Sequence, residues 1–287
     1  MQKYTEPCIN TSKFARLCNT NKRTLIHYDE IGLFKPAFTD ERGYRYYSET
    51  QCDLFFTITC LKDLGMPLKE IKQYVTDQNP ADLTVLLLEQ QKKVQKELQH
   101  LKRIEQVINN KLSLVSEGMN LSFDADGCSE PFTADFPEET YLATPFLGTK
   151  DHERLFTALC EHIGEVNHRF LNIGHAYGAM VMVDDLEAGQ FDQYAHFMTK
   201  ISPDESGAAD SSVGIHKKAA GQYAVLYLRG DYYESALAFQ KLLDYIRYHS
   251  FVPGKYCYKE PVWDELTVET KESYITRISI PVSYNKF

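Results

Sequence analysis

The sequence has few of the residues that mark disulfide, metal or membrane chemistry. It contains seven cysteines in 287 residues, an odd number without a Cys-x-x-Cys pair. That pattern gives neither a disulfide framework nor a thiolate zinc site, and it favours reduced thiols in a cytosol. No apolar run approaches the ~20 residues of a membrane helix, and the polar start MQKYTEPCINTSKFARL is unlike a signal peptide. We therefore expect a cytoplasmic chain with no metal, no cofactor and no membrane partner.

Charge is distributed unevenly along the chain. The formal net charge is −9, but residues 1–75 hold eleven Lys/Arg and nine Asp/Glu, a balance of +2. The remaining residues carry a net −11. A slightly basic head on an acidic body indicates two partners of opposite charge.

The first part of the chain, residues 1–78, fits short helices. Thr11 or Ser12 can cap a first helix, and Asn21 can cap a second helix over residues 22–31. Gly32 suits the C-terminal end of that second helix. Two helices joined by a turn of three or four residues form a helix-turn-helix.

A small wing and two further helices are predicted after the helix-turn-helix. Residues 40–43 read Asp-Glu-Arg-Gly, which is typical of a hairpin turn, and the alternating Tyr and Arg that follow suit a returning strand. Helices are expected over residues 48–64 and 68–76, separated by Gly-Met-Pro.

Residues 79–116 predict one long helix. Five apolar residues recur at intervals of seven, while Gln90, Glu97 and Lys111 interrupt the second heptad position; the five are Leu87, Val94, Leu101, Ile108 and Val115. An apolar stripe of this kind must pack against another surface to be removed from water. We expect an antiparallel coiled coil that forms a homodimer through residues 83–115. The alternative is packing of the stripe on the chain's own C-terminal domain.

The rest of the chain divides into a linker and a sheet domain. Residues 117–139 are rich in Gly, Pro and Asp and are predicted to be the linker. Residues 140–287 repeat the order strand, helix, strand, strand, which predicts a mostly antiparallel sheet built from two β-α-β-β halves. The fold class is therefore α+β, with a ligand site expected between the halves.

The predicted recognition helix and wing carry cations and aromatics suited to DNA. Lys and Arg pair with phosphates or guanine edges, Thr contacts a thymine methyl, and Tyr hydroxyls donate to phosphate without adding charge. The alternative is a solvated basic face over an aromatic core. The candidate DNA contacts are Lys22, Arg23, Thr24, His27 and Tyr28 in the helix, and Arg42, Tyr44, Arg45 and Tyr47 in the wing.

These motifs resemble the MerR family of transcriptional regulators. The segments KRTLIHYDEIGLFKP, ERGYRYYSETQ and LKDLGMPLKEI match its helix-turn-helix, first wing and second wing, and the resemblance covers residues 10–115. The sequence departs from the family at Ile26 and His27, where Arg and Tyr are customary. The family's metal sensors place Cys at the start of the dimer helix, whereas this chain has Asp77-Gln78-Asn79 there and Cys128 well beyond. That departure argues against a metal site and leaves redox sensing by Cys128 open.

The resemblance implies a mechanism as well as a fold. Dimers of this family bind promoter DNA between elements that are set too far apart. Inducer binding makes them untwist and kink the spacer, which realigns the promoter for RNA polymerase. Lys62 and Lys69, which flank the second wing, would hold the bent backbone. The implied partners are double-stranded promoter DNA, a second copy of the chain, RNA polymerase acting through the promoter, and a small-molecule effector.

The C-terminal half resembles GyrI-like effector-binding domains. The segments AAGQYAVLYLRGDYYES and YITRISIPV carry this resemblance. Together the two halves resemble multidrug-responsive activators that bind cationic aromatic compounds against a buried carboxylate. The resemblance places that carboxylate at Glu260, although Pro261 departs from the usual pattern. The candidate aromatic lining residues are Tyr177, Tyr233, Trp263 and Tyr274, whereas Asp264 and Glu265 are expected to be solvated.

Two other functions remain open from the sequence. The chain has no Gly-x-Ser-x-Gly, His-Glu-x-x-His or P-loop motif, so we do not expect an enzyme. A hydrolase remains an alternative, because Glu260 and a tyrosine could activate water. A protein that sequesters drugs and carries a DNA-binding head is the other alternative.

Overall fold

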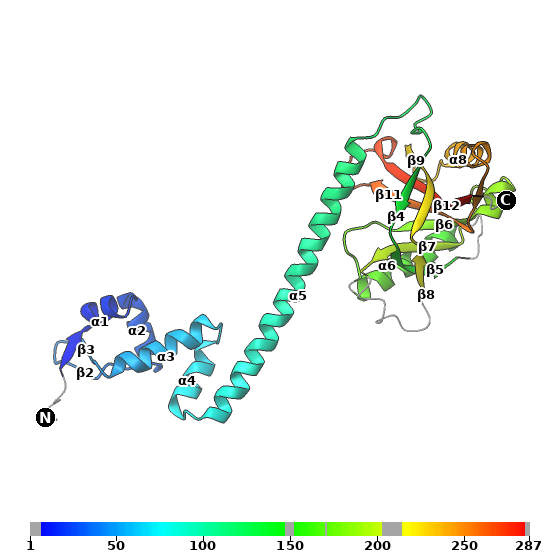
Figure 1. Ribbon diagram of the computed structural model, residues 1–287. Helices are drawn as coiled ribbons and strands as arrows, with labels where there is room; N and C mark the ends of the chain where they lie inside the picture. The colour runs from blue at the N-terminus through cyan, green and yellow to red at the C-terminus, as the bar shows by residue number, and fades with distance from the viewer. Residues whose placement is uncertain (1–6, 147–151, 170, 203–213, 285–287) are drawn as a thin grey trace. The chain divides into compact units, whose positions relative to one another are not determined.

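The computed structural model describes residues 7–146, 152–169, 171–202 and 214–284. The chain forms two compact units, Met1–His100 and Leu101–Phe287. Helices dominate the first unit, and a large sheet with two long helices forms the second, as expected for an α+β chain (Figure 1).

The first unit is a winged helix-turn-helix. A small antiparallel sheet in the order β1-β3-β2 accompanies four short helices. The elements are β1 (Cys8–Asn10), α1 (Thr11–Leu17), α2 (Lys22–Glu30), β2 (Phe38–Thr39), β3 (Arg45–Ser48), α3 (Gln51–Asp63) and α4 (Leu68–Thr76).

The helix-turn-helix begins and ends at capping residues. Asn21 caps α2 by accepting from the backbone N–H of Thr24 at 2.8 Å, as predicted. Gly32 has a φ of +67° just after α2, where a residue with a Cβ would be strained. The prediction for α1 was wrong by one or two residues, because Asn10 is its cap and accepts from Lys13 N–H at 2.9 Å.

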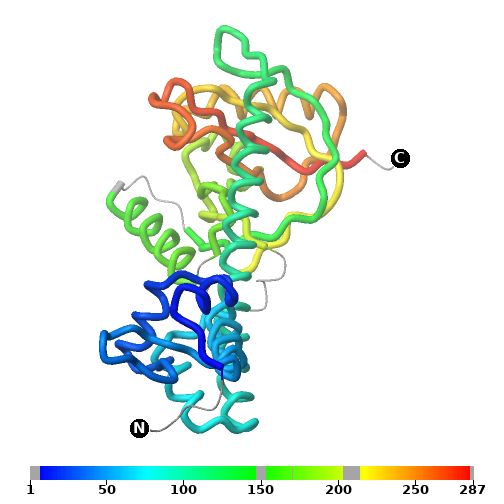
Figure 2. The backbone as a smooth tube through the Cα atoms, turned by 90° about the vertical axis from the view of Figure 1, so that its left-hand side faces the viewer, coloured from blue at the N-terminus to red at the C-terminus, as the bar shows by residue number. Residues whose placement is uncertain are grey.

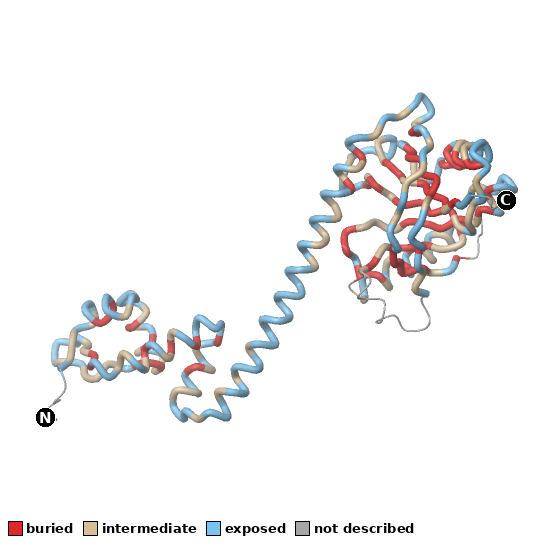
Figure 3. The backbone as a smooth tube through the Cα atoms, viewed as in Figure 1, coloured by how far each residue is buried: buried red, intermediate tan, exposed pale blue. Residues whose placement is uncertain are grey.

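Helix α5 (Pro80–Met119) is longer than predicted and continues through Gly118. The heptad residues Leu87, Val94, Leu101 and Ile108 are all exposed, between 40% and 52%. Figure 3 shows this helix exposed along most of its length. These four residues of the apolar stripe therefore remain uncovered within their own units, whereas Val115, the fifth, is half-buried.

The second unit is an antiparallel sheet with helices on one face. Its strands follow the order β4-β9-β12-β11-β6-β7-β5-β8, and β10 pairs with β12. The strands are β4 (Phe132–Phe136), β5 (Glu139–Pro145), β6 (Gly178–Met182), β7 (His196–Ile201), β8 (Gly214–Lys218), β9 (Gly221–Arg229), β10 (Phe251–Pro253), β11 (Tyr256–Trp263) and β12 (Ile275–Tyr284). The helices are α6 (His152–His168), α7 (Val183–Glu187) and α8 (Ala236–Tyr248), with a 3-10 turn at Lys271–Ser273.

Two repeated halves meet in the middle of this sheet. One half is β5-α6-β6-β7 and the other is β9-α8-β11-β12, and their second strands β6 and β11 pair with each other. The predicted β-α-β-β repeat is therefore present, with β4, β8 and β10 added to it. The centre of the sheet lies at the junction of the halves, where Lys259 pairs with Ala179.

Alternation along the strands gives the sheet two different faces. In β9, Ala224 and Leu226 pack in the core beneath α6 and α8, whereas Tyr223 and Val225 pack in a second cluster on the other face. Leu114 of α5 belongs to that second cluster. Figure 2 traces the backbone of this part of α5 alongside the strands.

The segment predicted as a linker is partly built into the sheet. Within residues 117–139, Phe132–Phe136 form the edge strand β4 and pair with β9. Phe123 packs against the second cluster. Gly127 has a φ of +75° and approaches the carbonyl of Arg229, so its glycine serves a close turn rather than a flexible connection.

Candidate nucleic-acid interface and ligand cavity

The first turn of α2 presents basic side chains to solvent. Lys22 and Arg23 are exposed, and His27 is exposed one turn further along. Thr24 is half-buried, and its hydroxyl lies 3.2 Å from the cap oxygen of Asn21. The N-terminal turns of such a helix are the ones that reach base edges in a major groove.

The tip of the wing presents Arg42 and Tyr44, both exposed. The carboxylate of Asp40 accepts from the backbone N–H groups of Arg42 at 3.0 Å and of Tyr44 at 2.7 Å. These two hydrogen bonds order the turn that carries the two exposed side chains. Lys62 at the end of α3 and Lys69 at the start of α4 are also exposed.

Three of the predicted DNA contacts have structural roles: two are buried in the core, and the third is half-buried in an ion pair. Tyr47 is fully buried, and its ring stacks on Phe34 at 5.5 Å. Tyr28 is also buried in this core. Neither tyrosine offers the exposed hydroxyl that the sequence suggested. Arg45 is half-buried and its Nε lies 2.7 Å from Asp29, so it ties the wing to α2.

Glu260 lies in the centre of the sheet, on the face opposite α6 and α8. Its Oε2 lies 3.0 Å from Lys218 Nζ and 3.2 Å from Arg277 Nη2. The hydroxyl of Tyr141 donates to Oε1 at 2.5 Å. Burial alone would raise the pKa of Glu260, but Arg277 and Lys218 outweigh it and hold the pKa far below its usual range. The carboxylate is thus ionised and already neutralised by the chain itself.

The ion pairs of Glu260 belong to a larger cluster of charged side chains. Glu139 lies 2.5 Å from Lys200 and 3.1 Å from Lys218. Arg277 also pairs with Glu117 of α5 at 3.0 Å. Three carboxylates therefore face three cations, and each charged group of the cluster has a partner.

The space beside Glu260 is small. Tyr141, Gly178 and Glu260 border a void of about 10 Å³, about enough for one water. Burial, followed by the charge of Glu260, raises the pKa of Tyr141 well above its usual value. A pair formed by Glu260 and a tyrosine thus exists, as the hydrolase alternative required, but it has no room for an organic substrate.

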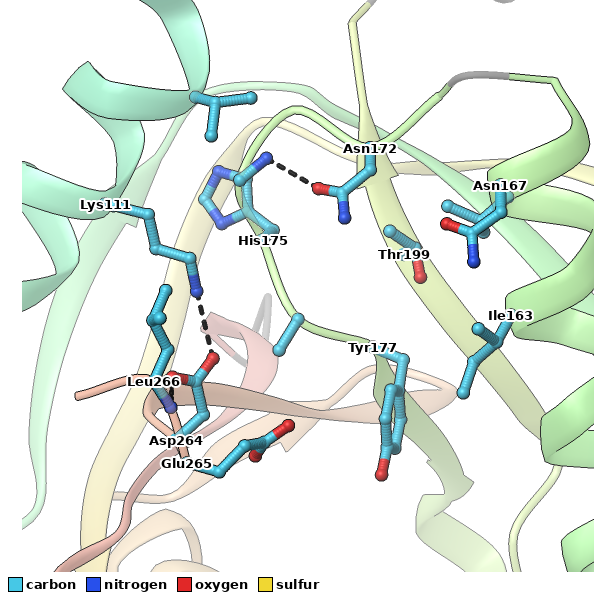
Figure 4. Close-up of a pocket in the computed structure, with 14 residues that line it drawn as sticks. Lys111, Ile163, Asn167, Asn172, His175, Tyr177, Thr199, Asp264, Glu265 and Leu266 are labelled. Carbon is cyan, nitrogen blue, oxygen red and sulfur yellow. Dashed lines mark hydrogen bonds and ion pairs between the residues drawn. The ribbon is translucent and has the colours of Figure 1, made fainter. Parts of the chain in front are cut away.

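A larger cavity of about 570 Å³ lies nearby within the second unit. Figure 4 shows Lys111, Asp264 and Glu265 on one side of it, and Ile163 and Asn167 on the other. Its wall is formed by Val107, Lys111, Ile163, Val166, Asn167, Asn172, Gly174, His175, Ala176, Tyr177, Thr199, Asp264, Glu265 and Leu266. Apolar side chains mixed with a few polar groups are typical of sites for small organic ligands.

The predicted aromatic residues have different relations to this cavity. Tyr177 lines it, and burial, followed by the nearby Tyr233, Glu265 and Tyr274, raises the pKa of Tyr177 to about 12. Tyr233 and Tyr274 are thus neighbours of Tyr177 rather than wall residues. Trp263 packs against Gly118 and donates to the carbonyl of Val115 at 3.3 Å, so it holds α5.

Sequence reasoning missed the charged residues of the cavity. Asp264 was expected to be solvated but is buried, and Lys111 Nζ lies 3.0 Å from its Oδ2. One signal was available, because Lys111 interrupts a heptad position and a lysine there needs a partner of its own. His175 also lines the wall, and burial, followed by the charge of Lys200, lowers its pKa to about 4.

Two features are absent from the described residues. No group of three His, Cys, Asp or Glu side chains among them is arranged to hold a metal ion. In the same residues, no helix combines the length and apolar character needed to cross a membrane.

Comparison with known proteins relates the chain to bacterial regulators. The family model described as MerR HTH family regulatory protein matches residues 9–78. The multidrug-efflux transporter 2 regulator of Bacillus subtilis (strain 168) is 29% identical over 272 residues, which are 95% of each chain. The mercuric resistance operon regulatory protein of Bacillus cereus is 33% identical over 104 residues, which are 33% of this chain and 76% of that protein. The crystal structure of MtaN, the N-terminus of the Bacillus subtilis multidrug transporter activator, is 30% identical with a TM-score of 0.33, and covers 36% of this chain and 97% of that one.

Proposed function

Because this chain belongs to the MerR family of helix-turn-helix regulatory proteins, we propose that it is a ligand-responsive transcriptional regulator that binds promoter DNA. The observation that carries this proposal is the exposed basic start of α2 beside an ordered wing. Lys22 and Arg23 would enter the major groove, and Arg42 and Tyr44 would contact phosphates, since all four side chains are exposed. Lys62 and Lys69 add cations beside the turn between α3 and α4.

The functional form that we propose is a homodimer through α5. The exposed stripe of Leu87, Val94, Leu101 and Ile108 suits a second copy of the same helix. Two copies would bring two recognition helices to one duplex, which suits an operator with two half-sites. Bending or untwisting of the spacer, as is typical of the family, would then act on RNA polymerase through the shape of the promoter.

We assign effector binding to the second unit, in the 570 Å³ cavity. This assignment is supported by the mixture of Tyr177, aliphatic side chains and polar groups in its wall. The curated relative from Bacillus subtilis is named for a multidrug-efflux transporter, and we propose a small organic effector here as well. Glu260 is paired with Lys218 and Arg277 in the centre of the sheet, so we do not assign it the role of the effector's counter-ion.

DNA selection tests the proposal directly. The purified chain is mixed with duplexes that carry a random core, and retained duplexes are amplified, sequenced and tested by footprinting. We expect enrichment of one motif with two related half-sites. Recovery of no sequence motif, with binding that stays nonspecific at physiological salt, would contradict the proposed function. Turnover of candidate compounds, measured in parallel, separates this function from that of a hydrolase.

A further inference from the structure

The wall of the 570 Å³ cavity carries an excess of negative charge. Among its described wall residues, Lys111 carries a formal positive charge, and Asp264 and Glu265 carry formal negative charges. His175 stays neutral, because burial and the nearby Lys200 lower its pKa to about 4. One positive and two negative groups therefore give the cavity a net charge of −1. A cation that leaves water for this site would find a compensating charge.

Asp264 is held in place by groups other than Lys111. Its Oδ1 accepts from the backbone N–H of Leu266 at 3.1 Å and from the hydroxyl of Thr267 at 3.3 Å. These contacts belong to the loop that follows β11 and do not involve α5. The carboxylate would therefore keep its position if the lysine moved away.

Lys111 has Asp264 as the partner of its ammonium. Its ammonium lies at the end of a flexible four-carbon stem, and its ion pair with Asp264 Oδ2 at 3.0 Å joins α5 to the loop after β11. Figure 4 shows this pair at the edge of the cavity, with Glu265 beside it. Glu265 is exposed and forms no ion pair within the described part of the chain.

We propose that Lys111 is an internal counter-ion for Asp264 and that an organic cation entering the cavity displaces it. This inference rests on the proposed effector site and identifies the charged residues of that site that would exchange partners. The incoming cation gains Asp264 and Glu265 as partners, and the ring of Tyr177 offers a cation–π face. Exchange of one cation for another leaves the charge of Asp264 compensated throughout.

The exchange would also change how α5 is held. Asn110 donates to the carbonyl of Ile173 at 2.6 Å, and Gly174 approaches the backbone of Val107 closely. Asn172 and residues 174–177 line the cavity, so α5 contacts its wall on two sides. Displacement of Lys111 would release one of these two attachments, and ligand binding would therefore change how α5 is held against the domain.

Two probes of matched shape test this inference in the full-length chain. Phenyltrimethylammonium carries a charge, and tert-butylbenzene has the same shape without one. Calorimetric titrations should show that Lys111→Met binds the cation at least tenfold more tightly than the wild type does, because the competing ammonium is gone. Affinity for tert-butylbenzene should change less than twofold. Lys241→Met is the control, since it removes an exposed ion pair with Asp124 in the same unit, and both affinities should stay unchanged.

A second variant decides the question if Lys111→Met folds poorly. Asp264→Asn keeps the shape of the wall and should weaken phenyltrimethylammonium at least tenfold while sparing tert-butylbenzene. Unchanged cation affinity in either variant, or an equal change for both probes, would overturn the inference. Retention of selected DNA by the wild-type chain is measured separately. Its failure would count against the proposed regulator and not against the cation exchange, because the titrations contain no DNA.

Discussion

The indole ring of Trp263 lies against Gly118, and its Nε1 donates to the carbonyl of Val115 at 3.3 Å. This contact fixes the last turns of α5 to the end of β11. A Cβ at Gly118 would collide with the indole ring, so glycine is required here despite its poor helix propensity. The contact also places the chain's one tryptophan where its fluorescence reports on α5.

We expect Gly118→Ala to destabilise the second unit by about 1–3 kcal/mol, because the added methyl overpacks the contact with Trp263. Urea unfolding followed by tryptophan fluorescence measures the change. Gly164→Ala in α6 is the matched control. Nothing lies within 4 Å of a Cβ added there, and alanine should stabilise by about 0.5–1 kcal/mol. Equal effects of the two substitutions would show that α5 is not packed on Trp263.

The DNA contact proposed for Arg23 makes a prediction about salt. Arg23→Ala should weaken operator binding and reduce the slope of log K against log salt by about 0.9 if one phosphate contact is lost. Lys13→Ala removes another exposed cation from α1 and should leave the slope unchanged. Fluorescence anisotropy at several salt concentrations measures both. An unaltered slope together with unaltered affinity for Arg23→Ala would remove this residue from the interface.

Much of the fold could be predicted from the sequence because its signals are local. Asn21 and Gly32 mark the ends of α2, and the sevenfold repeat marks α5. Burial of Tyr47 could not be predicted, since a tyrosine in a short strand can point to either face and only tertiary packing decides. The partners of Glu260 come from β8 and β12, far away in sequence, so its neutralisation was also beyond a local reading.

Ile108 offers a test of the dimer. Its side chain is 52% exposed in the single chain, and the proposed coiled coil would bury it. Ile108→Lys should therefore convert the dimer to monomer, because each copy would bring an unpaired ammonium into an apolar seam. The neighbouring Asn109→Lys adds the same charge at an exposed position outside the heptad series and should leave the dimer intact. Sedimentation equilibrium distinguishes the two, and a dimer that survives Ile108→Lys would place the interface elsewhere.

Lys259 should make stability depend on pH. It is fully buried beneath α8, its ammonium lies 3.8 Å from the centre of the Tyr232 ring, and burial lowers its pKa to about 7. Its unfolded pKa is about 10.4. Below pH 7 both states hold the proton and the full cost of burial is present. Between about pH 7 and 10 the folded state releases the proton while the unfolded state keeps it, so stability should rise by up to about 1.4 kcal/mol per pH unit.

The variant Lys259→Met isolates this contribution. It should lack the rise between pH 7 and 9, and its advantage over the wild type should be greatest near pH 6. The buried tyrosines titrate in both proteins, so the difference between the two unfolding curves removes their contribution. A difference that does not vary with pH would show that the Lys259 amine is not protonated on unfolding within this range.

Substitution of Glu260 distinguishes two roles for this carboxylate: membership of a structural ion cluster, or pairing with the charge of a bound ligand. Glu260→Gln leaves the fully buried ammonium of Lys218 with Glu139 as its remaining carboxylate partner. We expect a loss of about 3 kcal/mol in unfolding free energy, since removal of one member of a buried pair exposes the desolvation cost of the other. The exposed pair of Glu138 and Lys217 supplies the control, and Glu138→Gln should change stability by less than about 1 kcal/mol.

The same Glu260→Gln variant tests ligand binding. Because the charge of Glu260 is compensated within the chain, the variant should weaken the binding of phenyltrimethylammonium and of tert-butylbenzene to the same extent. A selective loss of the cation with unchanged stability would instead make Glu260 the ligand's own counter-ion and would remove that role from Asp264.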